Sequence, residues 1–215
     1  MAPSKCGSLD MFGTTRFLIK FAATVALVTT VANHAEASND AFMKTTGQTS
    51  IPIGHYQFCK TSPEECRTKT RGDVRVKLNN QNWNDLLKVN YDANLQIAPV
   101  TDAELYGTEE FWTYSTTAGD CEDYVLVKRR ALMAMGWPPA ALLITVVRQR
   151  NGEGHAVLTV RTDRGDLVLD NLESEVMLWN QTSYTYLKRQ SKNHTGKWET
   201  IQDGRVTSVG SVATN

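Results

Sequence analysis

A single cysteine lies among three carboxylates in the stretch GDCEDY, residues 119–124. Cys121 opens an expected helix, and the unpaired N–H groups and dipole of a helix start make a thiol easier to ionise. Asp120, Glu122 and Asp123 act the other way, because one carboxylate ~5 Å from the sulfur at an effective dielectric of ~20 opposes the thiolate by ~3 kcal/mol. Either these carboxylates only cap the helix and complement its dipole, or a positive group belongs beside them.

A base and an orienting acid for this thiol follow on two expected strands. His155 begins the segment HAVLTVR, and Asp170 ends LVLD after the turn TDRGD. In an antiparallel hairpin the numbers of paired residues have a constant sum. A turn centred between residues 163 and 164 gives 327, and His155 with Asp170 gives 325, so the two lie nearly opposite. Opposed side chains have Cβ atoms ~4.5–5.5 Å apart, which lets Asp170 orient the imidazole while its other nitrogen faces Cys121.

Two plainer interpretations compete with this catalytic one. Cys121 can be an inert buried cysteine, which is common. Cysteine, histidine and aspartate can also bind zinc, but the close ligand pairs typical of zinc sites, such as C-x₂-C, are absent from the sequence. The order nucleophile, base and acid on a helix, a strand and the adjacent strand favours a thiol hydrolase.

The elements that must position these residues predict an α+β fold. Apolar spacing indicates a helix over 74–97, capped by Asn79 or Asn80 and buried through Trp83, Leu86, Leu87 and Tyr91. A second helix spans Cys121 to Met135, with Val125, Leu132 and Met135 on its buried face. An antiparallel meander follows, with strands at 141–150, 155–161 and 167–170 and a last strand at 184–190. Residues 38–58 are expected to be an extended lead-in, and 98–119 a long connection.

The N-terminus predicts export. Positive residues, the apolar run FAATVALVTTVA and an A-x-A site at 35–37 are typical of a secretory signal over 1–37, which leaves a domain at 38–206 and a loose tail at 207–215. We therefore expect a periplasmic or secreted protein. Cys59 and Cys66 bracket a turn-rich segment and predict a disulfide, leaving Cys121 as a free thiol. A net charge of zero does not indicate the basic surface that nucleic-acid binding requires.

Three segments together resemble a known family. GDCEDY, GHAVLTV and LVLDNL are similar to the bacterial transglutaminase-like cysteine proteinases, in particular their LapG-like periplasmic branch. The resemblance implies a papain/transglutaminase-like core, with the nucleophile at the N-terminus of a helix packed on an antiparallel sheet. It implies a Cys121–His155–Asp170 triad and a calcium site with Asp120 and Glu122 as ligands, to which Asp123 can be added.

The resemblance also implies a substrate and partners. A protein of this branch is a calcium-assisted cysteine protease that releases a large biofilm adhesin from the cell surface, and an inner-membrane cyclic-di-GMP receptor controls it. Two alternatives remain open at this level. The same residues can transfer an acyl group to an amine, as transglutaminases do, or the domain can be a non-catalytic calcium-dependent binding module.

Overall fold

The computed structural model describes residues 40–70 and 73–205 of the 215-residue chain. The expected signal segment and the tail at 207–215 lie outside these residues. The helices are α1 (Ile53–Thr61), α2 (Asn80–Gln96), α3 (Asp102–Tyr106) and α4 (Cys121–Ala134), with short 3-10 turns at Pro63–Cys66, Pro139–Ala141 and Trp179–Gln181. The strands are β1 (Thr45–Thr49), β2 (Ala98–Pro99), β3 (Ala118–Gly119), β4 (Leu142–Arg148), β5 (Gly154–Thr162), β6 (Gly165–Leu169), β7 (Met177–Leu178), β8 (Thr185–Ser191) and β9 (His194–Ile201).

A seven-stranded antiparallel sheet forms the framework, in the order β1-β9-β8-β4-β5-β6-β7. The expected meander corresponds to β4, β5 and β6. Leu158 of β5 pairs with Leu169 of β6, so paired residue numbers sum to the predicted 327. The short strands β2 and β3 form a separate parallel pair that leads into α4.

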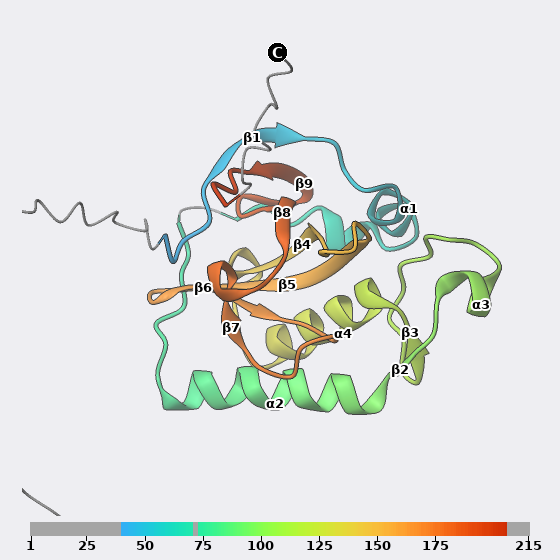
Figure 1. Cartoon of the computed structure of the whole chain (residues 1–215), viewed down its shortest axis with the longest axis horizontal. Coiled ribbons are helices and arrows are strands. Elements are labelled where there is room, and N and C mark those ends of the chain that lie inside the picture. Colours follow the sequence, from blue (N-terminus) through green and yellow to red (C-terminus); the bar gives the residue numbers. More distant parts are fainter. Residues whose placement is uncertain (1–39, 71–72, 206–215) are drawn as a thin grey trace, which may run out of the picture. The chain divides into compact units, whose positions relative to one another are not determined.

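Helix α4 packs on one face of this sheet, and α2 packs on α4. Figure 1 shows α4 between β5 and α2, and α4 packs on both β4 and β5. Because side chains alternate along a strand, β5 contributes Ala156, Leu158 and Val160 to the core under the helices and Val157 to a second apolar cluster. That second cluster includes Met43 and Trp179. The α+β class with a helix on an antiparallel sheet is confirmed.

Helix α4 begins at Cys121, as expected, but ends one residue earlier than expected, at Ala134. Met135 was expected on the buried face and is 48% exposed. Helix α2 begins later than expected, at a cap where the Asn79 side chain accepts a hydrogen bond from the amide of Asn82.

The predicted buried face of α2 was wrong. Leu87 and Tyr91 are exposed, and of the four expected residues only Leu86 is fully buried. The buried face of α2 runs through Leu86, Val89, Asn90 and Ala93. Asn90 is buried because its side-chain amide donates to the Ser174 carbonyl at 3.2 Å, and a polar residue on this face misleads an apolar-spacing prediction.

Two elements lie where extended or polar chain was expected. Helix α1 occupies the end of the lead-in and buries His55 and Phe58. Strand β9 lies in the polar C-terminal part, where Thr195, Trp198 and Ile201 are buried. No helix within the described residues combines the length and hydropathy that a membrane span requires.

Candidate active site

Cys121 occupies the first position of α4, at the point where the β2–β3 pair ends. The preceding Asp120 is the N-cap residue, but its side chain makes no capping bond. Instead Asp120 Oδ2 accepts from the Asp102 amide at 3.3 Å. The Cys121 sulfur is a half-buried free thiol and accepts a hydrogen bond from the Ala156 amide at 3.3 Å. This contact ties the start of α4 to the start of β5.

His155 and Asp170 contact each other directly. The His155 Nε2 and Asp170 Oδ1 atoms lie 2.7 Å apart, and both side chains are almost fully buried. Because Asp170 engages Nε2, Nδ1 is the ring nitrogen left to face a thiol, and Ala156, the residue after His155, contacts the Cys121 sulfur. The structure therefore brings the three residues of the expected triad to one place.

Two further groups hold the Asp170 carboxylate. The Tyr184 hydroxyl donates to Oδ2 at 2.5 Å, and the Leu172 amide donates to Oδ1 at 3.0 Å. Burial acts to raise the pKa of Asp170, but the bonds from His155, Tyr184 and Leu172 outweigh it and lower this pKa. Tyr184 was not predicted from the sequence as part of the site, because it lies just before β8, a strand that pairs with β4 and β9 and not with β6.

Glu122 lies against the nucleophile. The Cys121 thiol donates to Glu122 Oε2 at 3.2 Å. Burial, and then the charge of Glu122, raise the pKa of the thiol well above its usual range. Burial and the neighbouring Asp120 raise the pKa of Glu122 to about 9. The carboxylates that neighbour Cys121 in the sequence GDCEDY therefore also act on its thiol in the folded protein.

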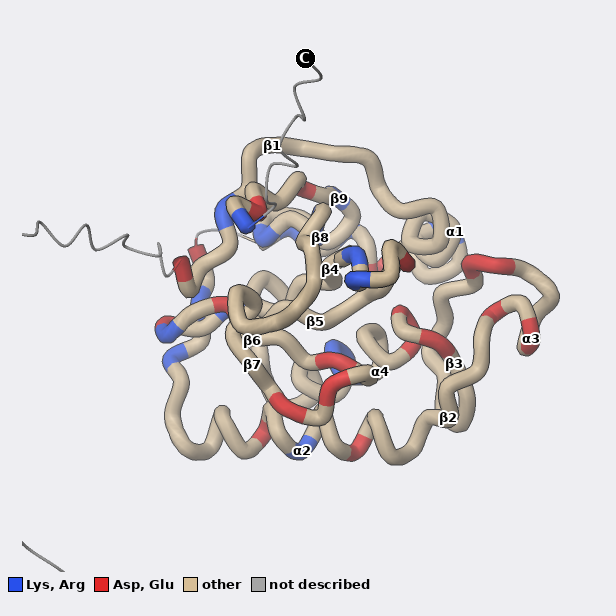
Figure 2. Tube along the Cα trace, viewed as in Figure 1, with Lys and Arg blue, Asp and Glu red and all other residues tan. Residues whose placement is uncertain are grey.

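The other two predicted acidic residues form a cluster with a third that was not predicted. Side-chain oxygens of Asp102, Asp120 and Asp123 lie within 4.8 Å of one another, and Figure 2 shows acidic positions around the start of α4. We call these three residues the acidic cluster. Glu122 is not one of the three, because its carboxylate turns toward Cys121. Asp102 enters from α3, and in the sequence it looks like an ordinary acidic first-turn residue.

Each carboxylate of the acidic cluster keeps one buried oxygen without a hydrogen-bond partner. These atoms are Asp102 Oδ1, Asp120 Oδ1 and Asp123 Oδ2. Burial is the main cause that raises the pKa of Asp102 and brings that of Asp123 to about 7. Gly119 allows this packing, since a Cβ at that position would lie 2.3 Å from Asp123 Oδ2. Three carboxylates that each keep an unsatisfied buried oxygen, and that each bring an oxygen within 4.8 Å of the other two, are suited to a hard cation.

A second group with metal-ligand residue types has another explanation. His55, Cys59 and Cys66 lie close together, but the two sulfurs are joined in a disulfide. The expected Cys59–Cys66 bond is thereby confirmed. Among the described residues, no group suited to a metal includes Cys121 or His155, so the zinc alternative has no support from the geometry.

Comparison with known proteins places the chain. The sequence model described as bacterial transglutaminase-like cysteine proteinase, BTLCP, matches residues 45–206. Among solved structures, Legionella pneumophila LapG has 26% identity over 54% of this chain and 68% of its own, with a TM-score of 0.46. The calcium-bound Legionella pneumophila LapG has 23% identity over 74% and 94%, with a TM-score of 0.48. No curated protein matches. Because the family model covers most of the sequence, the chain belongs to the bacterial transglutaminase-like cysteine proteinases and is a cysteine peptidase of the transglutaminase-like type.

Proposed function

We propose that Cys121, His155 and Asp170 form the catalytic triad of this peptidase. The supporting observation is the buried 2.7 Å contact between His155 Nε2 and Asp170 Oδ1 beside a free thiol bonded to the Ala156 amide at 3.3 Å. Asp170 fixes the tautomer with the proton on Nε2, which leaves Nδ1 as the acceptor.

In the first half of the reaction, Nδ1 of His155 accepts the thiol proton. The Cys121 sulfur forms a bond to the scissile carbonyl carbon and gives a tetrahedral oxyanion. When this collapses, the C–N bond breaks, the leaving amine takes the proton from His155, and a thioester remains on Cys121. Water then attacks the thioester, again losing its proton to His155, and the acid product leaves with the thiol restored.

The first turn of α4 supplies donors for the oxyanion. The first N–H groups of a helix have no partner within the helix. The Asp120 side chain does not cap them, because Oδ2 accepts from Asp102 instead. Because Asp120 does not cap this turn, the Cys121 amide at its start is the first candidate to stabilise the developing negative charge.

The acidic cluster is the proposed calcium site. Calcium takes hard oxygen ligands, and Asp102, Asp120 and Asp123 each offer an unpartnered buried oxygen. Glu122 lies beside the cluster, since Asp120 is one of the groups that raise its pKa, and it can join as a further ligand. Calcium, when bound, would neutralise the carboxylates next to the nucleophile and fix the start of α4.

The same proposal includes where the peptidase works and which proteins it meets. The signal-like segment at 1–37 favours a periplasmic or secreted enzyme. The substrate is a protein, and a large surface adhesin is the specific candidate, with an inner-membrane cyclic-di-GMP receptor as regulator. The sequence resemblance is the support for both partners.

Peptide cleavage by single variants tests the proposal. On a library of quenched-fluorescent peptides, Cys121→Ala should abolish cleavage and His155→Ala should cost nearly as much, because triad members act as a unit. His194→Ala, which removes a histidine from β9, is the matched control and should cleave normally. Retained cleavage by Cys121→Ala would refute the triad, and transfer of the acyl group to an added amine in place of hydrolysis would identify a transglutaminase.

A further inference from the structure

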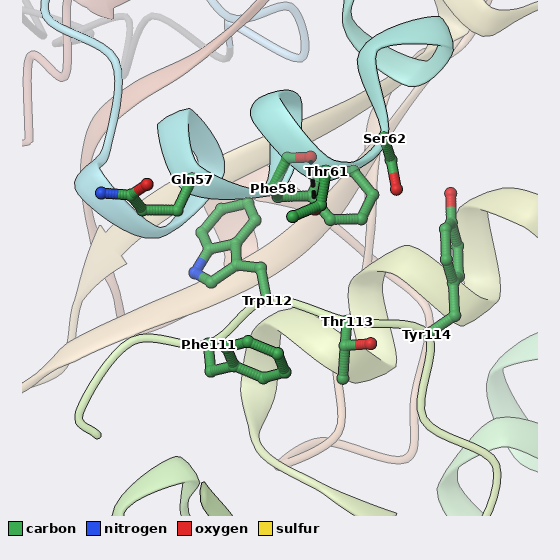
Figure 3. A pocket seen from close by; sticks show the side chains of 8 residues that line it. All are labelled: Gln57, Phe58, Thr61, Ser62, Phe111, Trp112, Thr113 and Tyr114. Atoms are coloured by element: carbon green, nitrogen blue, oxygen red, sulfur yellow. Dashed lines mark hydrogen bonds between the residues drawn. The ribbon is translucent and has the colours of Figure 1, made fainter. Parts of the chain in front are cut away.

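A pocket of about 310 Å³ opens between α1 and the segment that precedes β3. Figure 3 shows the two walls that enclose it. One wall is formed by α1 and its end, and the other by the chain at 111–114. We call it the aromatic pocket, and its lining residues are Gln57, Phe58, Thr61, Ser62, Phe111, Trp112, Thr113 and Tyr114.

The lining defines what the aromatic pocket can hold. Four of the eight residues are aromatic, the others are neutral and polar, and none carries a charge. Trp112 satisfies its indole N–H outside the lining, by donating to Glu110 Oε2 at 3.1 Å, so its ring contributes apolar surface. Such a lining favours an aromatic or branched apolar group over a charged one.

The pocket is close to the nucleophile. The Thr113 amide donates to Asp123 Oδ1 at 2.9 Å, and Asp123 lies in the same first turn of α4 as Cys121. One turn of helix rises only about 5.4 Å. One wall of the pocket is therefore bonded directly to the helix turn that carries Cys121.

Both walls of the pocket are fixed in place. The amides of Phe111 and Thr113 donate to carboxylates of the acidic cluster, Asp102 and Asp123 respectively. On the opposite side Gly54 lets Trp112 pack against α1, since a Cβ there would lie 2.3 Å from the indole nitrogen. A pocket held from both sides is preformed, which is what a specificity site requires.

We propose that the aromatic pocket is a substrate subsite that takes one bulky apolar side chain of the polypeptide near the scissile bond. The inference rests on the proposed role of Cys121 as the nucleophile. It narrows the substrate to protein segments that carry such a side chain within a few residues of the cleaved bond. The polar residues at the rim, Gln57 and Ser62, can bond the peptide backbone on either side.

Protection of Cys121 from iodoacetamide tests the subsite by binding, independently of turnover. The probes are acetylated hexapeptide amides of alanine in which leucine or phenylalanine replaces each position in turn. At equal millimolar concentration, at least one leucine or phenylalanine peptide should slow alkylation about tenfold more than the all-alanine peptide. In Thr61→Trp, where the larger side chain fills the pocket from an exposed position, that advantage should disappear.

Two comparisons make the result decisive. Tyr56→Trp places the same side chain on the exposed surface of α1 outside the pocket lining and should retain the advantage. Alkylation without peptide should be equal in all three proteins, which shows that the thiol and the fold are intact. Equal protection by all peptides, or an unchanged preference in Thr61→Trp, would overturn the subsite. A thiol that does not react with iodoacetamide at all would instead refute the nucleophile.

Discussion

Removing the Tyr184 hydroxyl should show how much its hydrogen bond to Asp170 contributes to stability and activity while the His155–Asp170 contact stays in place. This hydroxyl is the one protein donor to Asp170 Oδ2 among the described hydrogen bonds, at 2.5 Å. The other oxygen, Oδ1, keeps its bonds to His155 Nε2 and the Leu172 amide. Tyr184→Phe therefore leaves the imidazole oriented and deprives one buried carboxylate oxygen of its partner.

The expected magnitudes follow from that geometry. Leaving a buried acceptor without a partner costs about 1–3 kcal/mol. For a domain of this size each kcal/mol lowers Tm by about 2–4 °C, so Tm should fall by about 2–12 °C. Because His155 stays bonded, kcat/KM should fall by less than about tenfold, whereas loss of the correct tautomer in Asp170→Asn should cost about 10⁴-fold, as in serine protease triads.

The pH dependence gives the variant a signature. The pKa of Asp170 is lowered in the folded protein, so ionised Asp170 stabilises the fold above its unfolded pKa near 3.9, and this contribution is lost as pH falls through the folded value. Tyr184→Phe removes one of the hydrogen bonds that lower the pKa of Asp170, so the variant loses part of the stability that ionised Asp170 provides. The Tm difference from the wild type should therefore be largest near pH 7 and shrink below about pH 4.

Thermal unfolding from pH 3 to 7, together with peptide cleavage, measures both effects. Tyr186→Phe is the matched control, because its buried hydroxyl bonds Thr182 Oγ1 at 3.0 Å and does not contact Asp170. It should lower Tm without pH dependence and leave kcat/KM unchanged. A Tyr184→Phe deficit that does not change with pH, or a loss of activity as large as that of Asp170→Asn, would refute this account of the support.

Three further outcomes are expected. In EGTA, Tm should fall as pH rises from about 4 to about 7, because burial raises the pKa of the Asp123 carboxyl to about 7 and its protonation stabilises the fold only below that value. Calcium should raise Tm most at pH 8, and an equal Tm with and without calcium there would contradict the site. Asp166→Ala should cost about 3–5 kcal/mol in denaturant unfolding, because it leaves the buried Arg189 without its 3.1 Å partner; a loss within about 0.5 kcal/mol would contradict this. Reduction of Cys59–Cys66 should lower stability by about 2–3 kcal/mol, and an unchanged denaturation midpoint in reductant would argue against the bond.

The parts of the site that lie close in sequence could be predicted. Cys121 begins a helix because GDCEDY contains its own start signals, and the register between His155 and Asp170 follows from a short hairpin with one turn. Both are local features, so hydrophobic period and turn position were sufficient.

The parts that depend on packing between distant segments could not be predicted. Asp102 joins the acidic cluster because the β2–β3 pair brings α3 beside α4. Tyr184 contacts Asp170 although it precedes β8, which pairs with β4 and β9 and not with β6. The buried face of α2 was missed because Asn90, a polar residue, lies at its centre. The 3.2 Å bond from the Cys121 thiol to Glu122 could not be predicted either, because it depends on the rotamer of the glutamate side chain.

The most direct measurement is the capture of the acyl-enzyme. The protein is mixed with a peptide that it cleaves, and the reaction is quenched in acid within the first turnover. The modified residue is then located by peptide mapping with mass spectrometry. We expect a thioester on Cys121, with the mass of the acyl half of the peptide, and no adduct in His155→Ala. Cleavage that proceeds while Cys121 stays unmodified, or an adduct on another residue, would show that Cys121 is not the nucleophile.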